Sequence, residues 1–184
     1  MSAVSAPFGF RPAYNPIGLD RAKKYTIAAA YGTAIYEGQP VILNTNGTIT
    51  AGTAAADLLG VFAGCEYIDV TGKPNVSNYW PGTAGATNIV AWVYDDPNNV
   101  YEVQSDGSIA QTAIGDQADI SNATANSNGR SQATLSSTVA TVGVQAQFRI
   151  VGFGQQLDNA PGDAFTICQV QIARHQYITS KVAI

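Results

Sequence analysis

The chain has 184 residues and a formal net charge of −4, and only 12% of its residues are charged. Soluble domains average about 25% charged residues. Here Asn, Gln, Ser and Thr take their place, which favours packing against other proteins over electrostatic steering. The acidic balance argues against a nucleic-acid binder, because such proteins need a basic patch. No run approaches the roughly 18 apolar residues of a membrane span.

The first 20 residues differ from the rest of the chain. Residues 7–18 hold three prolines and two glycines, and proline is excluded from helix interiors and central strands. The same stretch carries apolar side chains that a free linker would lack. We therefore expect an extended N-terminal arm at residues 1–20 that lies on its own domain or on a neighbouring subunit. The residues expected to make this contact are Phe8, Phe10, Arg11, Pro12, Tyr14 and Ile17.

From residue 21 onward, short apolar runs alternate with turn residues, and helical periodicity is nearly absent. Asn46-Gly47 between two apolar runs predicts a hairpin with a type I′ turn, and only 51–59 could form a turn or two of helix. The expected strands lie at 25–27, 34–36, 41–43, 48–50, 58–63, 67–70, 89–94, 100–104, 117–121, 133–135, 148–153 and 165–172, with a polar tip at 122–131. This spacing predicts an all-β protein, with residues 21–184 forming a β-sandwich or barrel.

The last expected strand has an irregular apolar pattern. Its apolar positions change phase between Ile167 and Cys168. Since successive strand residues face opposite sides, this predicts either a β-bulge or a strand buried on both faces.

Residues that could carry chemistry are few, and we expect no enzyme. The single histidine, His175, lies seven positions from Cys168, about 23 Å apart in one strand at 3.3 Å per residue. A Cys/His pair is therefore not expected. Residues 1–10 lack a secretory signal, so we expect assembly in a cytoplasm with Cys65 and Cys168 as free thiols.

Metal, cofactor and sugar binding are also not expected. The acidic residues near turns could bind calcium, but they lack EF-hand spacing, and Asp and Asn in turns usually bond their own backbone; these residues are Asp95, Asp96, Asp106, Asp116 and Asp119. The aromatic residues Tyr79, Trp80, Trp92 and Tyr94 could stack on sugar rings, but core or interface packing is favoured.

Three parts of the sequence, the second of which is a pair of segments, together resemble the head decoration (cement) proteins of tailed bacteriophages. They are Gly9-Phe10-Arg11-Pro12, the pair Glu37-Gly38-Gln39-Pro40-Val41 and Leu59-Gly60-Val61-Phe62-Ala63-Gly64, and Ile172-Ala173-Arg174-His175-Gln176-Tyr177. The pair of segments at 37–41 and 59–64 is also similar to decoration proteins with the β-tulip fold. The likeness covers the arm, roughly residues 31–64 and the C-terminal strand, while the middle of the chain is only generically β-rich.

The resemblance implies a structural virion protein on the capsid exterior that binds the major capsid protein and stabilises the shell. It also implies a homo-oligomer, with a trimer favoured, and no catalysis or cofactor. A tail or fibre subunit is the first alternative, since those proteins are also β-rich and polar. A carbohydrate-binding β-sandwich is the second.

Overall fold

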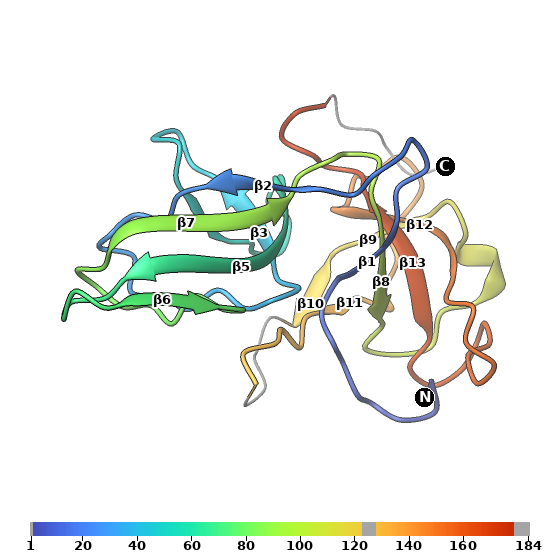
Figure 1. Ribbon diagram of the computed structural model, residues 1–184. Helices are drawn as coiled ribbons and strands as arrows, with labels where there is room; N and C mark the ends of the chain where they lie inside the picture. Colours follow the sequence, from blue (N-terminus) through green and yellow to red (C-terminus); the bar gives the residue numbers. More distant parts are fainter. Residues whose placement is uncertain (1, 123–127, 179–184) are drawn as a thin grey trace.

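A computed structural model describes residues 2–122 and 128–178, and it is almost entirely β-structure (Figure 1). The strands gather into two lobes, each with its own hydrophobic core. The expected all-β class is confirmed. Within the described residues, the one helical element is a 3₁₀ turn, η1 (Gln111–Ala113), and no helix is long and apolar enough to cross a membrane.

The first lobe, which we call the barrel lobe, is a strongly curved antiparallel sheet. Its strands run in the order β2-β7-β5-β3-β4, and a short parallel bridge joins Thr26, just after β2, to Thr48, just before β4. The Ile49 N–H donates to Thr26 O at 2.9 Å, so the two ends of the sheet meet and it closes into a small barrel. The strands are β2 (Ala22–Tyr25), β3 (Pro40–Leu43), β4 (Ile49–Ala51), β5 (Gly60–Ile68), β6 (Pro74–Ser77) and β7 (Thr87–Tyr94).

Trp80 fills the barrel interior, where it is completely buried. Its indole Nε1–H donates to Tyr31 O at 3.1 Å, and the Tyr67 ring meets it edge-on at 5.2 Å. A buried indole needs such a partner for its N–H. The expected packing role of Trp80 is therefore confirmed, while Trp92 is half-buried under the Lys24 ammonium, 5.1 Å from its ring centre.

The second lobe, which we call the sheet lobe, is built from strands far apart in the sequence. Its main sheet has the order β1-β8-β13-β12-β9, and the β10-β11 hairpin adjoins it where Ser105 bridges to Leu135. Phe10 and Phe148 stack at its centre with ring centroids 4.3 Å apart. The strands are β1 (Arg11–Tyr14), β8 (Val100–Gln104), β9 (Gln117–Ala118), β10 (Ile120–Asn122), β11 (Thr134–Leu135), β12 (Phe148–Phe153) and β13 (Ile167–Ile172).

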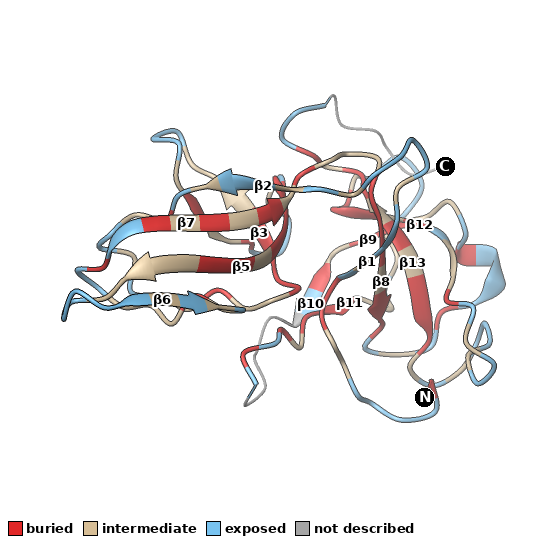
Figure 2. Ribbon diagram, viewed as in Figure 1, coloured by how far each residue is buried: buried red, intermediate tan, exposed pale blue. Residues whose placement is uncertain are grey.

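Strand β5 connects the two cores. Val61 belongs to the core of the sheet lobe and its neighbour Phe62 to the core of the barrel lobe, as expected for side chains that alternate across a strand. Figure 2 shows buried residues along β5 and β7 and along β8 and β13, with exposed residues at the loops and on β6. The lobes are therefore covalently and sterically coupled.

The N-terminal residues do not form an arm separate from the domain within the part of the chain described. Strand β1 is an edge strand that pairs with β8, and the Phe10 side chain is completely buried in the sheet lobe. Residues 2–14 therefore belong to the domain that was expected to begin at residue 21. Of the two expected placements, the structure thus has the one on the chain's own domain, where the Phe10 ring fills a place in the core; burying such a ring gains about 1.5–3 kcal/mol.

Several local expectations are confirmed, and two are corrected. Strands β8 and β12 have the predicted bounds, and β3 and β4 form the predicted hairpin. Its turn is not type I′: Gly47 alone is left-handed (φ 79°) and its N–H donates to Asn44 O, which makes a three-residue loop. The runs 58–63 and 67–70 form one strand, β5.

The phase change in the last strand has a clear structural counterpart. The register between β12 and β13 shifts between Ile150 and Gly152, so the extra residue, Val151, lies in β12. In β13 itself, Ile167 and Cys168 are both buried. Residues 123–127 of the expected polar tip lie outside the described residues.

Candidate functional site

The junction between the two lobes brings together the first two segments on which the resemblance rests. The Phe10 N–H donates to Gly38 O at 2.8 Å, and the Gly38 N–H donates to Phe62 O at 2.9 Å. One backbone chain of hydrogen bonds therefore links the N-terminal segment, the loop before β3 and the start of β5.

The glycines of these segments allow close backbone contact. A Cβ on Gly60 would lie 2.1 Å from Tyr94 O, which no side chain tolerates, and Gly38 has a left-handed φ of 79° with Phe10 O next to it. Such positions require glycine. These motif residues are thus explained by packing of the two lobes, whatever the protein binds.

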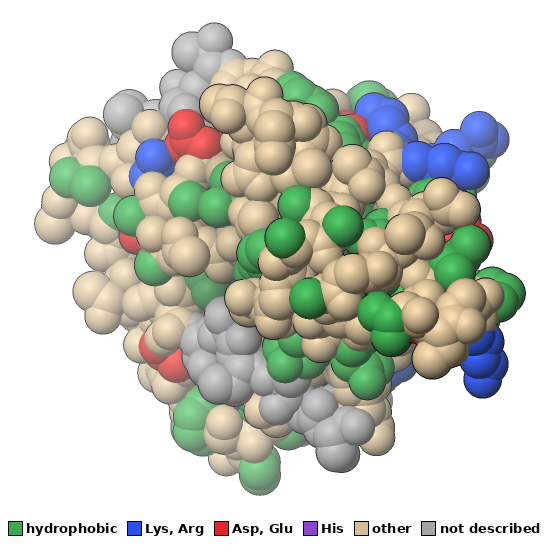
Figure 3. Space-filling view, turned by 90° about the vertical axis from the view of Figure 1, so that its left-hand side faces the viewer, with side chains coloured by type: hydrophobic (Ala, Val, Ile, Leu, Met, Phe, Trp, Pro, Cys, Tyr) green, Lys and Arg blue, Asp and Glu red, His purple; other side chains and the backbone are tan. Residues whose placement is uncertain are grey.

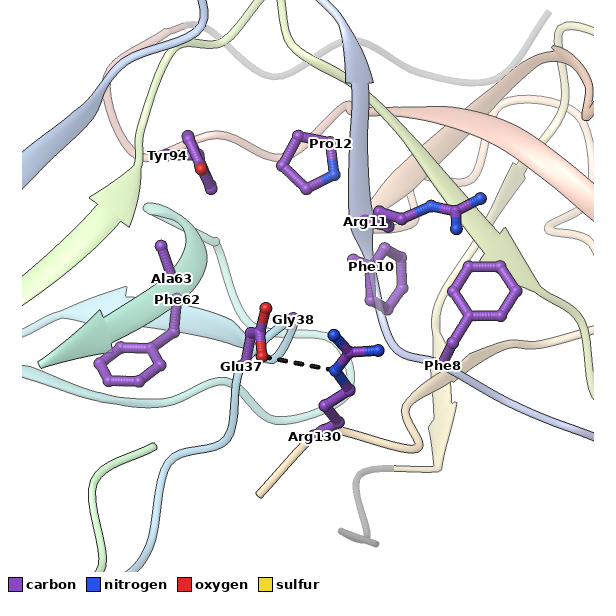
Figure 4. A pocket seen from close by; sticks show the side chains of 10 residues that line it. All are labelled: Phe8, Phe10, Arg11, Pro12, Glu37, Gly38, Phe62, Ala63, Tyr94 and Arg130. Atoms are coloured by element: carbon purple, nitrogen blue, oxygen red, sulfur yellow. Dashed lines mark ion pairs between the residues drawn. The ribbon is translucent and has the colours of Figure 1, made fainter. Parts of the chain in front are cut away.

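A pocket of about 170 Å³ opens at this junction (Figure 4). Four of the six residues predicted to make contacts line it: Phe8, Phe10, Arg11 and Pro12. The rest of its wall consists of Glu37, Gly38, Phe62, Ala63, Tyr94 and Arg130. The volume is enough for one side chain of a partner, and the wall offers both aromatic rings and charged groups.

The charged groups of the pocket are already paired within the chain. Arg130 Nε lies 3.5 Å from a carboxylate oxygen of Glu37, as Figure 4 shows. The Arg11 guanidinium lies 2.5 Å from Glu102 and 4.9 Å from the centre of the Phe8 ring. Arg11 was expected to donate to a partner, and here it braces the N-terminal segment against β8.

The remaining two predicted residues lie outside the pocket. Tyr14 is 49% exposed and Ile17 is 73% exposed, and Leu19, which sequence reasoning did not single out, is 75% exposed. Of the six predicted residues, Phe10 is fully buried, Phe8 and Pro12 are half-buried, and Arg11, Tyr14 and Ile17 are exposed. The proline-rich composition of the segment could not reveal this division.

The third segment of the resemblance fastens the C-terminal end of the chain to the barrel lobe. The Leu58 N–H donates to Arg174 O at 2.8 Å, and the Gln176 N–H donates to Leu58 O at 2.9 Å. The Gln176 amide also bonds Leu43 twice, accepting from its N–H at 2.7 Å and donating to its O at 2.9 Å. Like the glycines, these residues have a structural role.

A buried polar network lies beside this segment. The Asp95 carboxylate accepts hydrogen bonds from Lys23 Nζ at 3.1 Å and from Tyr25 OH at 2.7 Å. His175 Nε2 lies 3.1 Å from Asp95 O, and its Nδ1 accepts the Tyr177 N–H at 3.1 Å. Because Nδ1 accepts, Nε2 carries the proton and donates to Asp95 O.

Burial shifts the pKa of two members of this network, His175 and Tyr25. It lowers the pKa of His175 below its usual 6.5, so the ring is neutral, and it raises the pKa of Tyr25. Sequence reasoning placed Asp95 in a turn and missed this network, because its partners Lys23 and Tyr25 are some 70 positions away. A neutral histidine bonded at both nitrogens has no free atom for a substrate, so its role here is structural.

The other groups considered for chemistry are engaged within the chain. Burial raises the pKa of both Cys65 and Cys168 to about 12, and the two thiols lie in different cores. The Asp96 carboxylate accepts the Asn98 N–H at 2.8 Å, which is the turn bonding expected from the sequence. Across residues 2–122 and 128–178, no group of three or more His, Cys, Asp or Glu side chains is placed to hold a metal ion.

Three comparisons with known proteins found no match. No protein-family model matches the sequence, and neither a curated protein nor a solved structure matches it. The function must therefore be inferred from the chain itself.

Proposed function

We propose that this protein is a non-enzymatic structural virion protein that binds the outer surface of a tailed-phage capsid and stabilises the shell. Its partners are the major capsid protein and further copies of itself, with a trimer favoured by the resemblance. It needs no cofactor and assembles in the host cytoplasm.

The exposed apolar side chains of the N-terminal segment carry this proposal. Tyr14, Ile17 and Leu19 are 49–75% exposed, although the same segment buries Phe10 completely. A contiguous exposed apolar patch is typical of a protein contact site, and these three side chains all lie within residues 14–19. Burying each gains about 1.5–3 kcal/mol for a Leu- or Phe-sized side chain.

The uncharged surface supports the same reading. Figure 3 views the molecule from the side where the barrel lobe lies; the charged side chains of this face lie around its edges, and its middle is apolar and uncharged polar. On the β5-β6 hairpin of this lobe, Val70 and Val76 are 67% and 87% exposed. A surface of this kind suits a broad contact formed by shape and hydrogen bonds, as a shell protein needs.

The placement of the two tryptophans disfavours the sugar-binding alternative. Trp80 is enclosed in the barrel core and presents no open ring face, and the Lys24 ammonium lies over the half-buried Trp92 ring. A tail or fibre subunit stays the competing proposal. Cryo-electron microscopy of the particle that carries this chain would distinguish the shell from the tail.

Co-sedimentation with undecorated capsids tests the proposal directly. We expect wild-type protein to pellet with capsids, and a variant with Tyr14→Ser, Ile17→Ser and Leu19→Ser to bind at least about tenfold more weakly, which is 1.4 kcal/mol. Its melting temperature should stay close to that of the wild type, because the three side chains are exposed.

A matched control carries Val142→Ser and Val144→Ser, which are also exposed apolar residues but lie in the loop before β12. This control should bind as the wild type does. Failure of wild-type protein to bind capsids would refute the function, and unchanged binding by the triple variant would refute the contact surface.

A further inference from the structure

The N-terminal segment, residues 2–15, is held by a set of contacts that any copy of the chain could supply. The buried Gln104 side chain accepts the Ala6 N–H at 2.8 Å and donates to Val4 O at 3.0 Å, so it clips the backbone of the segment. Further along, the Phe165 N–H donates to Ser2 O at 2.7 Å. None of these partners is close to the segment in sequence.

The strand within this segment is suited to exchange. Strand β1 lies at the edge of the sheet and has one strand neighbour, β8. An edge strand can leave and be replaced without opening any other strand pair. The Phe10 ring would then pack beside Phe148 in the same core position, whichever chain provides it.

The connection that follows is a suitable hinge. Residues Pro16, Ile17, Gly18 and Leu19 are all exposed, and a Cβ on Gly18 would meet no atom within 4 Å. The turn is closed from within by two bonds to Asn15, from the Gly18 N–H to its O at 3.3 Å and from the Ile17 N–H to its Oδ1 at 3.0 Å. The Asn15 amide, which ends the exchanged segment, donates to Asp96 and Asn99, so another copy could supply these partners too. Four extended residues span about 13 Å, enough to pass between touching subunits.

The hinge also joins the two lobes. Before it, β1 belongs to the sheet lobe, and after it, β2 belongs to the barrel lobe. If the hinge opens, the N-terminal segment can reach the sheet lobe of a neighbour while the barrel lobe stays in place. Exchange of an identical element is a low-cost route to an oligomer.

From these features we infer that copies of this chain exchange residues 2–15, each placing β1 beside β8 of its neighbour and Phe10 in the neighbour's core. The inference extends the proposed function, because it names a second copy as the partner of the segment assigned there to protein contact. It also accounts for the exposure of Ile17 and Leu19 in the monomer. In an oligomer, a neighbouring subunit would cover these two side chains.

Disulfide trapping tests the exchange in the isolated protein. Arg11 and Glu102 are directly paired residues of β1 and β8, and paired antiparallel residues lie about 4.5–5.5 Å apart at Cα, within disulfide range. The variant with Arg11→Cys and Glu102→Cys is refolded at increasing protein concentration, oxidised and run on a denaturing gel without reductant.

We expect covalent dimers or larger species whose share rises with concentration. The control pair, Arg149→Cys with Gln171→Cys, joins β12 to β13 and should link only within one chain. Wild-type protein controls for Cys65 and Cys168, which are buried. Should the first pair prevent folding, Tyr14→Cys with Val100→Cys probes the same two strands.

Links within single chains at every concentration would overturn the inference. That outcome would leave the proposed function standing if wild-type protein still binds capsids. Conversely, exchange in a protein that binds no capsid would refute the proposed function and leave the inference intact.

Discussion

The two lobes differ in how their strands come together along the chain. In the barrel lobe, β3 pairs with β4 and β5 with β6 as hairpins, so many contacts are local. In the sheet lobe, β1 pairs with β8, which pairs with β13, so its core unites residues from Phe10 to Ile172. Turns therefore specify more of the barrel lobe, and burial of distant residues specifies more of the sheet lobe, although β2 pairs with the distant β7 and β12 with the next strand, β13.

The largest expected effect is that of removing the Phe10 ring. Phe10→Ala should destabilise the sheet lobe by about 3–5 kcal/mol, as is usual for a buried aromatic. Both tryptophans lie in the barrel lobe, so urea unfolding followed by fluorescence and by far-ultraviolet circular dichroism reports the lobes differently. We expect the dichroism transition to move more.

Phe8→Ala is the matched control, since Phe8 is only half-buried, and it should cost clearly less. Loss of under about 1 kcal/mol in the Phe10 variant would mean that the N-terminal segment is not part of the core.

The second expected effect tests the coupling of the lobes. Gly60→Ala places a Cβ 2.1 Å from Tyr94 O, and overpacking of this kind typically costs about 1–3 kcal/mol. Because Gly60 begins β5, whose next residues enter both cores, both optical transitions should shift. Gly32→Ala, where a Cβ meets nothing within 4 Å, should leave both unchanged; equal effects would refute the close-contact explanation.

The difference between the lobes also explains what the sequence could predict. Asn46-Gly47 marks a hairpin because the turn and both its strands lie within ten residues, and the same local logic found β8 and β12. No local pattern could place Phe10 beside Phe148, since 138 positions separate them. The sequence therefore predicted that the N-terminal segment is extended and packs on a protein surface, but it could not identify the core around Phe148 as that surface.

The candidate site also contains residues that a local sequence pattern predicts and contacts that it does not. Sequence reasoning found Phe8, Phe10, Arg11 and Pro12, which line the pocket, because their proline-rich context stands out. It missed Glu37 and Arg130 as an ion pair, which forms only when the lobes meet, and it missed the Asp95 network, whose partner Lys23 lies 72 positions away in the sequence.

A smaller effect is expected from pH. The pKa of His175 is lowered by burial, so the folded chain binds fewer protons than the unfolded chain once the pH falls below about 6.5. Stability from the neutral ring is complete above that pH and is lost as the pH falls toward the folded-state pKa. Since the chain has one histidine, His175→Gln should flatten this part of a plot of unfolding free energy against pH. An unchanged slope would refute the assignment.

The smallest expected effect is that of metal removal. EDTA should leave the melting temperature within about 1–2 °C, because even 1 kcal/mol would shift it by about 2–4 °C at this size. Turn aspartates bond groups of their own turn: the Asp69 carboxylate accepts the Thr71 hydroxyl and the Lys73 and Thr71 N–H groups, which lower its pKa to about 2. A fall of about 10 °C would instead indicate a bound cation that stabilises the fold.

Cys65 and Cys168 give the molecule one internal probe in each lobe. Each thiol lies in a different core, and burial raises the pKa of both to about 12, so neither reacts until its surroundings open. The rate at which each cysteine is alkylated in native buffer therefore measures how often its own lobe opens. Peptide mapping of the alkylated chain would measure the opening rate of each lobe separately, without any substitution.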